Sequence, residues 1–356
     1  MEIETPVCVT GASGFIAAHI VRELLERGYR VRGTVRSLAD PDKYRYLTSL
    51  PGAAERLELV EAELTTEGSF DEAVKGCRVV IHTASPYVID VEDPQRDLVD
   101  PAVSGTLNVL RSAKDAGAQR VVLTSSMAAI SDEPRDDHVF TEADWNERSS
   151  LTRNPYYFSK AEAERAAWRF VEEQSPGFDL VVINPYMVLG PSLGPSLNTT
   201  NQLFRDILQG VYPGIMSLSW GFVDVRDVAR AHVLAMETDE ASGRYLCAGE
   251  EMDMKTLVGV LKEAGYDRGF QLPRMDLACS VGDFAARLMS YTQPKGTGSY
   301  LRTHLGKRMR YDNAKIRREL GMEFRPAKDA VLDAVEDLFR HGHLERPAGA
   351  TRPAEA

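Results

Sequence analysis

The sequence predicts an α/β protein in which a doubly wound parallel sheet is followed by a smaller C-terminal α+β lobe. Short apolar runs alternate with helical patterns from Val7 to Thr124. Several of these runs are followed by small or hydroxyl residues, and the regular alternation weakens after Ile183. Strands that alternate with helices form parallel sheets with both faces covered, and their ligands bind beyond the carboxyl ends of the strands.

Length and composition exclude several classes of protein. The chain has 356 residues and a net charge of −11 without a basic stripe, which argues against binding of nucleic acid. Its four cysteines lack Cys-x-x-Cys spacing, so neither a disulfide framework nor a metal site is expected. No apolar run reaches about 18 residues and the N-terminus does not resemble a signal peptide. We therefore expect a cytoplasmic protein that does not bind a membrane.

The first predicted βαβ unit contains a glycine-rich turn. A strand ends at Thr10, a helix is expected from Phe15 to Arg27, and a second strand from Arg30 to Val35. Glycines in such a turn let a pyrophosphate approach backbone N–H groups at the helix N-terminus, as in Rossmann-type sheets. A tight turn without a ligand remains the alternative. The candidate cofactor residues here are Gly11, Ala12, Ser13, Gly14, Phe15 and Ile16.

The end of the second strand favours NADP over NAD. An NAD site places Asp or Glu here to bind the ribose hydroxyls, whereas this chain has Arg36, with Lys43 seven residues later. A carboxylate would repel a 2′-phosphate, and a guanidinium can bind it with paired hydrogen bonds. A solvated surface arginine is the alternative interpretation of Arg36.

Further elements follow in order through the first half of the chain. Strands are expected at Leu57–Glu61, Val79–Thr83, Arg120–Thr124 and Val181–Ile183. A helix capped by Ser69 is expected before the second of these, and a long helix from Pro94 to Ala116 before the third. Because Thr83-Ala84-Ser85 and Thr124-Ser125-Ser126 end two of these strands, we expect a cofactor to lie across them.

A tyrosine lies four residues before a lysine at the start of the next helix. The spacing of Tyr156 and Lys160 places both side chains on one helix face, where the ammonium would lower the pKa of the phenol. That makes the phenol a better proton donor near neutral pH. The same spacing recurs at Tyr291/Lys295 and Tyr311/Lys315. Of the three pairs, only Tyr156 and Lys160 begin the helix that comes next after the strand ending near Ser126, and this position favours them as the functional pair.

Together these motifs resemble the extended short-chain dehydrogenase/reductase superfamily, and within it the branch of dihydroflavonol 4-reductases, cinnamoyl-CoA reductases and yeast-type methylglyoxal/aldehyde reductases. The motifs are Thr10-Gly11-Ala12-Ser13-Gly14-Phe15-Ile16-Ala17, Val31-x-Gly33-Thr34-Val35-Arg36, His82-Thr83-Ala84-Ser85-Pro86, Thr124-Ser125-Ser126, Tyr156-x-x-x-Lys160 and Val223-Asp224-Val225-Arg226-Asp227-Val228-Ala229.

This resemblance implies an NADPH-dependent carbonyl reductase that converts an aldehyde or ketone into an alcohol. Tyr156 would donate a proton to the carbonyl oxygen, Lys160 would lower the pKa of Tyr156 and hold the nicotinamide ribose, and Ser126 would hydrogen-bond the oxygen. Ser126, the last residue of its run, corresponds to the catalytic serine of the family. His232 is expected to pack on a helix without a catalytic role.

The resemblance also implies further cofactor contacts. Arg36 and Lys43 would bind the 2′-phosphate, and the other residues implied are Glu63, Leu64, Thr83, Ala84, Ser85, Tyr156, Lys160, Pro185, Val188 and Thr200. Glu63 stands where the family usually has Asp. Ser131 stands where flavonoid reductases have a substrate-binding Asn, which counts against a flavonoid substrate.

The expected organisation is a Rossmann-type NADP-binding domain at residues 5–185 with contributions from about 220–248, a substrate-binding lobe at 186–343, and a disordered tail at 344–356. A monomer or homodimer is expected, with a small carbonyl compound as substrate. Two alternatives remain: a nucleotide-sugar epimerase or dehydratase with tightly bound NAD, and a non-catalytic NADP-binding protein. The identity of the substrate cannot be predicted from this sequence.

Overall fold

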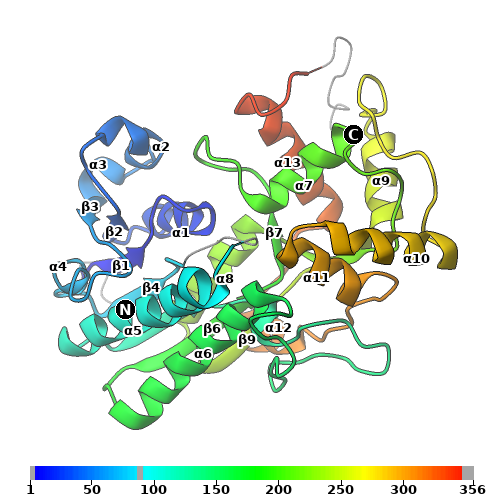
Figure 1. The fold of residues 1–356 in the computed structure, drawn as a ribbon. Coiled ribbons are helices and arrows are strands. Elements are labelled where there is room, and N and C mark those ends of the chain that lie inside the picture. The colour runs from blue at the N-terminus through cyan, green and yellow to red at the C-terminus, as the bar shows by residue number, and fades with distance from the viewer. Residues whose placement is uncertain (1–4, 86–90, 347–356) are drawn as a thin grey trace.

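A seven-stranded sheet, parallel throughout, forms the centre of the computed structural model, which describes residues 5–85 and 91–346 (Figure 1). Its strand order is β3-β2-β1-β4-β5-β6-β9. The bounds are β1 Val7–Thr10, β2 Val31–Val35, β3 Leu57–Glu61, β4 Val79–His82, β5 Arg120–Thr124, β6 Asp179–Pro185 and β9 Gly243–Cys247. The predicted Rossmann-type sheet is confirmed.

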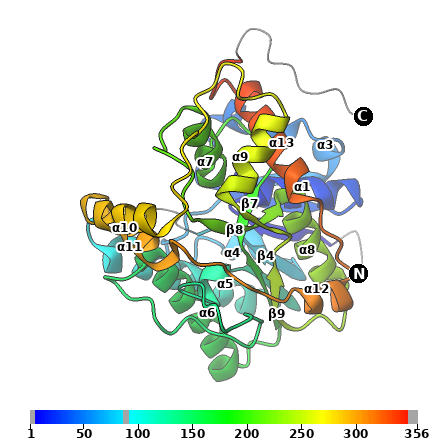
Figure 2. The same cartoon turned by 90° about the vertical axis from the view of Figure 1, so that its right-hand side faces the viewer.

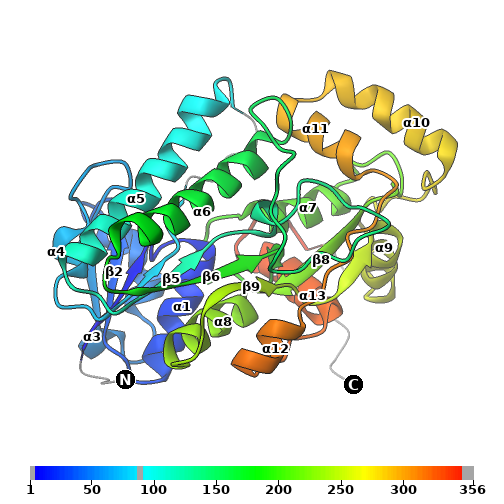
Figure 3. The ribbon, with the colours of Figure 1, turned by 90° about the horizontal axis from the view of Figure 1, so that it is seen from below.

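Continuous apolar strands are needed because helices cover both faces of this sheet. Val7 and Val9 of β1 belong to a core with α1 (Phe15–Glu26) and α8 (Val225–Glu237). Cys8 lies between them in sequence and belongs to the core on the opposite face, with α4 (Asp71–Val74), α5 (Asp100–Asp115) and α6 (Pro155–Gln174). Successive side chains of a strand point to opposite faces. Figure 3 shows α5 and α6 on one side of the sheet and α1 and α8 on the other.

One local prediction in this half was wrong. Ser69 does not cap the following helix, because α4 begins only at Asp71 and Phe70 is the residue at its N-cap. The long helix predicted from Pro94 to Ala116 is confirmed, with a π-helix at Gln95–Val99 that leads directly into α5. The remaining short helices near β2 and β3 are a 3-10 helix at Pro41–Tyr44, α2 Arg45–Thr48 and α3 Ala53–Arg56.

A small mixed sheet lies in the C-terminal region (Figure 2). Its central strand β8 (Ser219–Asp224) pairs in parallel with β7 (Met187–Leu189) and antiparallel with β10 (Glu251–Asp253). A third apolar core joins this sheet to α7 (Thr199–Leu208), α9 (Met254–Glu263) and α13 (Ala327–Arg340). The other helices here are α10 Ser280–Met289, a 3-10 turn at Ser290–Thr292, α11 Lys295–His304 and α12 Ala314–Leu320.

Packed structure extends three residues into the segment predicted to be a disordered tail. Leu344 is buried against the core of the C-terminal region, and Arg346 forms an ion pair with Glu336. Residues 347–356 of that prediction lie outside the described residues. Within the described ranges, no helix combines the length and apolar character that crossing a membrane requires.

Candidate active site

The glycine-rich turn has the backbone conformation that its sequence predicts. Gly11 has a φ of 65°, in the left-handed region that favours glycine, and its N–H donates to the Thr34 hydroxyl at 2.9 Å. A Cβ at Gly11 would lie 3.2 Å from two atoms of Ala84. Gly14 caps α1 with extended backbone, and no side chain of the described residues satisfies the N–H groups of the first turn there. An anion could therefore be bound by these groups.

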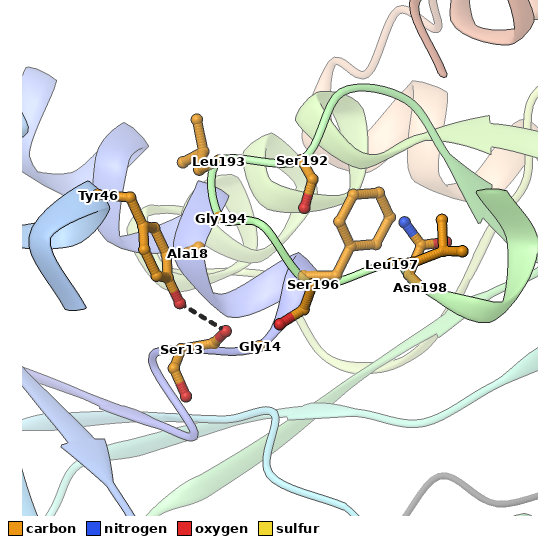
Figure 4. A pocket seen from close by; sticks show the side chains of 11 residues that line it. Ser13, Gly14, Ala18, Tyr46, Ser192, Leu193, Gly194, Ser196, Leu197 and Asn198 are labelled. Carbon is orange, nitrogen blue, oxygen red and sulfur yellow. Dashed lines mark hydrogen bonds between the residues drawn. The ribbon is translucent and has the colours of Figure 1, made fainter. Parts of the chain in front are cut away.

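The turn borders a cavity of about 190 Å³, shown in Figure 4. Tyr46 borders one side, and its hydroxyl donates to the Ser13 carbonyl at 2.9 Å. The loop from 192 to 198 covers another side and contributes Asn198, whose side-chain oxygen accepts from the Asn201 N–H at 2.9 Å. Its amide nitrogen is buried and finds no partner among the described residues. A buried amide donor beside this cavity suits a phosphate or carboxylate oxygen.

Most residues of this cavity were missed by the sequence interpretation. The missed lining residues are Ala18, Tyr46, Ser192, Leu193, Gly194, Ser196, Leu197 and Asn198. Asn198 stands two residues before the predicted Thr200, which lies in the first turn of α7 and does not line the cavity. The segment from Leu197 to Thr200 therefore reaches the cavity through Leu197 and Asn198, and the cofactor contact of Thr200 stays a prediction.

Two cations lie at the predicted 2′-phosphate position after β2. Arg36 directly follows the strand and Lys43 lies in the 3-10 helix at Pro41–Tyr44; both are exposed. Neither forms an ion pair with an acidic residue in the described part of the chain. The acid at the end of the neighbouring strand, Glu61, accepts a hydrogen bond from the Leu38 N–H. The two cations therefore remain available for an anion.

The ends of β1 and β4 are joined by a buried hydrogen-bond network. The Thr10 hydroxyl accepts from the N–H groups of Thr83 and Ala84, each at 3.1 Å, and lies 2.8 Å from the His82 ring. Since both lone pairs are then used, the hydroxyl donates to His82 Nδ1. Burial lowers the pKa of His82 to about 3, so the ring is neutral at physiological pH. The network fixes Thr83, Ala84 and Ser85 beside Gly11.

Tyr156 and Lys160 lie in the first two turns of α6. The Lys160 ammonium donates to the Ser85 hydroxyl at 2.7 Å and lies 5.6 Å from the centroid of the Tyr156 ring. Burial lowers the pKa of Lys160 from 10.5 to about 8. Ser126 follows β5 and caps a 3-10 turn at Met127–Ala129, against which α6 packs. The structure therefore brings together the end of β4, the turn after β5 and the start of α6.

The two competing Tyr-x-x-x-Lys spacings do not form the same arrangement. Tyr291 belongs to a 3-10 turn that ends before α11, where Lys295 is the first residue. Tyr311 precedes α12, and its hydroxyl donates to the Gly249 carbonyl. Neither tyrosine shares a helix with its lysine, so only Tyr156 and Lys160 lie one turn apart on one helix.

The remaining predicted positions are dispersed around the same edge of the sheet. Glu63 is exposed and accepts from the Leu64 N–H at 2.9 Å, while Leu64 packs so closely on Gly105 of α5 that a Cβ there would clash. Pro185 ends β6 and Val188 lies in β7. Ser131 is buried and donates to the Glu133 carbonyl at 2.8 Å.

His232 lies in α8 and is fully buried. Its Nδ1 donates to the Val228 carbonyl at 2.7 Å, and the Thr124 hydroxyl lies 2.7 Å from Nε2. Burial lowers its pKa to about 4, so it is neutral. No cluster of three or more His, Cys, Asp or Glu suited to a metal occurs in residues 5–85 and 91–346.

Comparisons with known proteins identify the class to which this fold and this edge of the sheet belong. The model of the NAD dependent epimerase/dehydratase family matches residues 7–248. The chain belongs to this family, the extended short-chain dehydrogenase/reductases. It is an oxidoreductase of that family, and it is homologous to reductases.

Several of these relatives are similar over nearly their whole length. Cinnamoyl-CoA reductase CAD2 of Medicago truncatula is 48% identical over 341 residues, covering 93% of this chain and 95% of that protein. Tetraketide alpha-pyrone reductase 1 of Arabidopsis thaliana is 37% identical over 350 residues, covering 95% and 96%. The structure of Gre2 from Candida albicans in complex with NADPH has a TM-score of 0.77 and 34% identity, covering 95% of this chain and 99% of that one.

Proposed function

We propose that the chain is an NADPH-dependent reductase that converts the carbonyl group of an aldehyde or ketone into an alcohol, with Ser126, Tyr156 and Lys160 as catalytic residues. The observation that carries the proposal is the placement of Lys160. Its buried ammonium is anchored by Ser85 at the end of β4, beside the Tyr156 ring. In the part of the chain that the structure describes, no carboxylate forms an ion pair with it.

The residues around the glycine-rich turn fit a dinucleotide. The backbone at Gly11 and Gly14 and the amide nitrogen of Asn198 would hold the pyrophosphate. Arg36 and Lys43 would hold the 2′-phosphate that distinguishes NADPH from NADH. This assignment agrees with the Gre2 structures from Candida albicans and yeast, which are complexes with NADPH.

Each catalytic side chain has a distinct role in this proposal. NADPH, when bound, supplies the hydride. Tyr156 donates its phenolic proton to the carbonyl oxygen. The Lys160 ammonium favours the phenolate that remains and thereby makes the phenol a stronger acid. Ser126 donates a hydrogen bond to the same oxygen while negative charge develops there.

The surroundings of Ser125 and Ser126 support the choice between them. The Ser125 hydroxyl donates to the buried Glu164 carboxylate. The Ser126 oxygen instead accepts from the Ala128 N–H at 3.1 Å, so its own hydrogen can be donated to a substrate. Ser126 is also partly exposed, whereas Ser125 is buried. A substrate oxygen can therefore reach only the second hydroxyl without disturbing the core.

A panel of substrates tests the proposed activity. NADPH oxidation is followed with aryl and alkyl aldehydes and ketones and, because of the relatives' names, with an aryl coenzyme A thioester; NADH is compared in parallel. We expect turnover with NADPH and weaker turnover with NADH. Absence of turnover on every carbonyl, together with NAD that stays bound through purification, would contradict the proposal and favour an epimerase or dehydratase.

The Tyr156→Phe variant tests the proton donor. We expect kcat to fall roughly 100-fold or more, the range for loss of a general acid, while the Kd for NADPH stays within about twofold. Tyr157→Phe is the matched control, since the neighbouring ring lies against His304 and has no proposed role in the chemistry. If Tyr156→Phe retained its rate, the assignment of the proton donor would be wrong.

A further inference from the structure

The middle of the catalytic helix contains a buried carboxylate that the proposed chemistry does not use. Glu164 lies one turn after Lys160 in α6 and is 1% exposed. It accepts hydrogen bonds from Asn184 Nδ2 at 2.7 Å, Arg244 Nε at 2.6 Å and Trp168 Nε1 at 3.2 Å, and also from the Ser125 hydroxyl. Four donors therefore converge on one carboxylate.

These donors connect the catalytic helix to the segment that holds Ser126. Ser125 is the residue directly before Ser126. Asn184, in β6, uses the same Nδ2 to donate to the Ser126 carbonyl at 3.2 Å. Glu164 therefore holds the Ser125–Ser126 segment through two contacts, while the helix on which it lies carries Tyr156 and Lys160.

Arg244 is one of the four donors to Glu164, and its own contacts fix the position of the carboxylate. Arg244, in β9, is buried and donates to the carbonyls of Glu142 and Asp144 besides Glu164. Its guanidinium also lies 4.0 Å from the centroid of the Trp145 ring. These contacts hold the Arg244 guanidinium through Nε and Nη1, and the guanidinium in turn positions the Glu164 carboxylate.

We infer that Glu164, with Asn184, is a positioning residue for the reductase chemistry, which sets the Ser126 hydroxyl relative to the Tyr156 hydroxyl. The inference rests on the proposed function, since it assumes that both hydroxyls act on one carbonyl oxygen. Two donors can share one oxygen only if the turn after β5 and the start of α6 keep a fixed separation. A displacement of about 1 Å can lower a rate roughly 100-fold.

Glu164→Gln is the informative substitution because glutamine has the same shape. All four partners are donors, so the new amide NH₂ faces at least one N–H or O–H group. Asn184 can adapt by turning its amide, since its side-chain oxygen is buried without a partner in the described structure. The turned amide can no longer donate to the Ser126 carbonyl, and the Ser126 segment is released.

The experiment compares kcat in two backgrounds, with saturating NADPH and the panel carbonyl that is reduced fastest. Glu164→Gln should lower kcat about 10- to 100-fold, while the Kd for NADPH stays within about twofold. In a Ser126→Ala background the same substitution should lower kcat by no more than about twofold, because the group that it positions is absent. Asn184→Ala should show the same pattern.

Glu162→Gln is the matched control, because Glu162 lies on the same helix and pairs at 2.9 Å with Arg165, which donates no hydrogen bond to Glu164 among the described contacts. It should keep the wild-type kcat. Equal losses in both backgrounds, an unchanged kcat, or loss of NADPH binding in both Glu164→Gln and Asn184→Ala would overturn the inference. If Ser126→Ala itself kept the wild-type kcat, the proposed role of Ser126 would fail instead.

Discussion

Replacing Lys160 with methionine should abolish most activity and yet stabilise the cofactor-free protein. Burial lowers the pKa of Lys160 from 10.5 to about 8. At about 1.4 kcal/mol per tenfold change in the ionisation constant, burial of the charge costs about 3 kcal/mol at pH 7. Methionine avoids this cost but loses the bond to Ser85, which contributes about 1–2 kcal/mol. We expect a free energy of unfolding about 1–2 kcal/mol higher than that of the wild type.

The difference in stability between Lys160→Met and the wild type depends on pH. The folded-state pKa of this base is below its unfolded value, so the wild type carries the full penalty below about pH 8 and loses it as the pH rises toward 10.5. Denaturant unfolding without cofactor at pH 7 and pH 9.5 measures the difference. Lys262→Met, on the exposed end of α9, should change stability by less than about 0.5 kcal/mol. A less stable Lys160→Met at pH 7, or the same difference at both pH values, would refute the reasoning.

Three further predictions concern the cofactor site. Arg36→Glu should raise the Kd for NADPH about tenfold or more and the Kd for NADH much less, because a carboxylate repels the 2′-phosphate. Fluorescence titration measures both Kd values, and an equal rise in the two would contradict the prediction. Gly11→Ala should lower the free energy of unfolding by about 1–2 kcal/mol and weaken NADPH binding, because φ at this position is 65° and Ala84 lies 3.2 Å from the new Cβ. An unchanged free energy of unfolding would contradict this prediction. The kcat/KM for NADPH should fall as the pH rises through about 8, where Lys160 loses its proton; a flat profile to pH 9.5 would contradict it.

The sequence predicted the large sheet well because its signals are local. A strand such as β4 has a continuous apolar run, Val79–Ile81, when both faces of the sheet are covered, and a parallel sheet places all its carboxyl ends at one edge. Gly11 could be predicted for the same reason, since the turn that needs it is only a few residues long. The Ser69 cap was wrong because α4 begins two residues after Ser69, at Asp71, so Phe70 and not Ser69 is the residue at the helix N-cap.

The cavity beside the glycine-rich turn depends on contacts between residues that are far apart in the sequence, which short sequence patterns do not contain. The loop from 192 to 198 reaches the turn because α13 and α1 hold it: Asp337 accepts from the Ser192 N–H at 2.9 Å, and His19 lies 2.8 Å from the Pro191 carbonyl. These partners are more than 140 residues from the loop in sequence. Nothing in the spacing of the loop residues encodes such contacts, so the lining residues from 192 to 198 could not be derived from the residues themselves.

Arg244 shows that one signal for distant contacts does exist in the sequence. It stands directly before the apolar run Tyr245-Leu246-Cys247, and a strand with this neighbourhood is buried. A buried guanidinium requires an acid and further acceptors, since an unpaired charge in the core costs several kcal/mol. The acid is Glu164, 80 residues earlier, which is the one carboxylate that α6 turns fully into the core. Removing either partner alone would leave a buried charge and cost about 3–5 kcal/mol, so truncation would mix a folding defect with any effect on catalysis. Glu164→Gln keeps the size of the side chain but also leaves the Arg244 charge without a counter-charge, so it is the comparison of kcat with and without Ser126→Ala that separates the positioning role from stability.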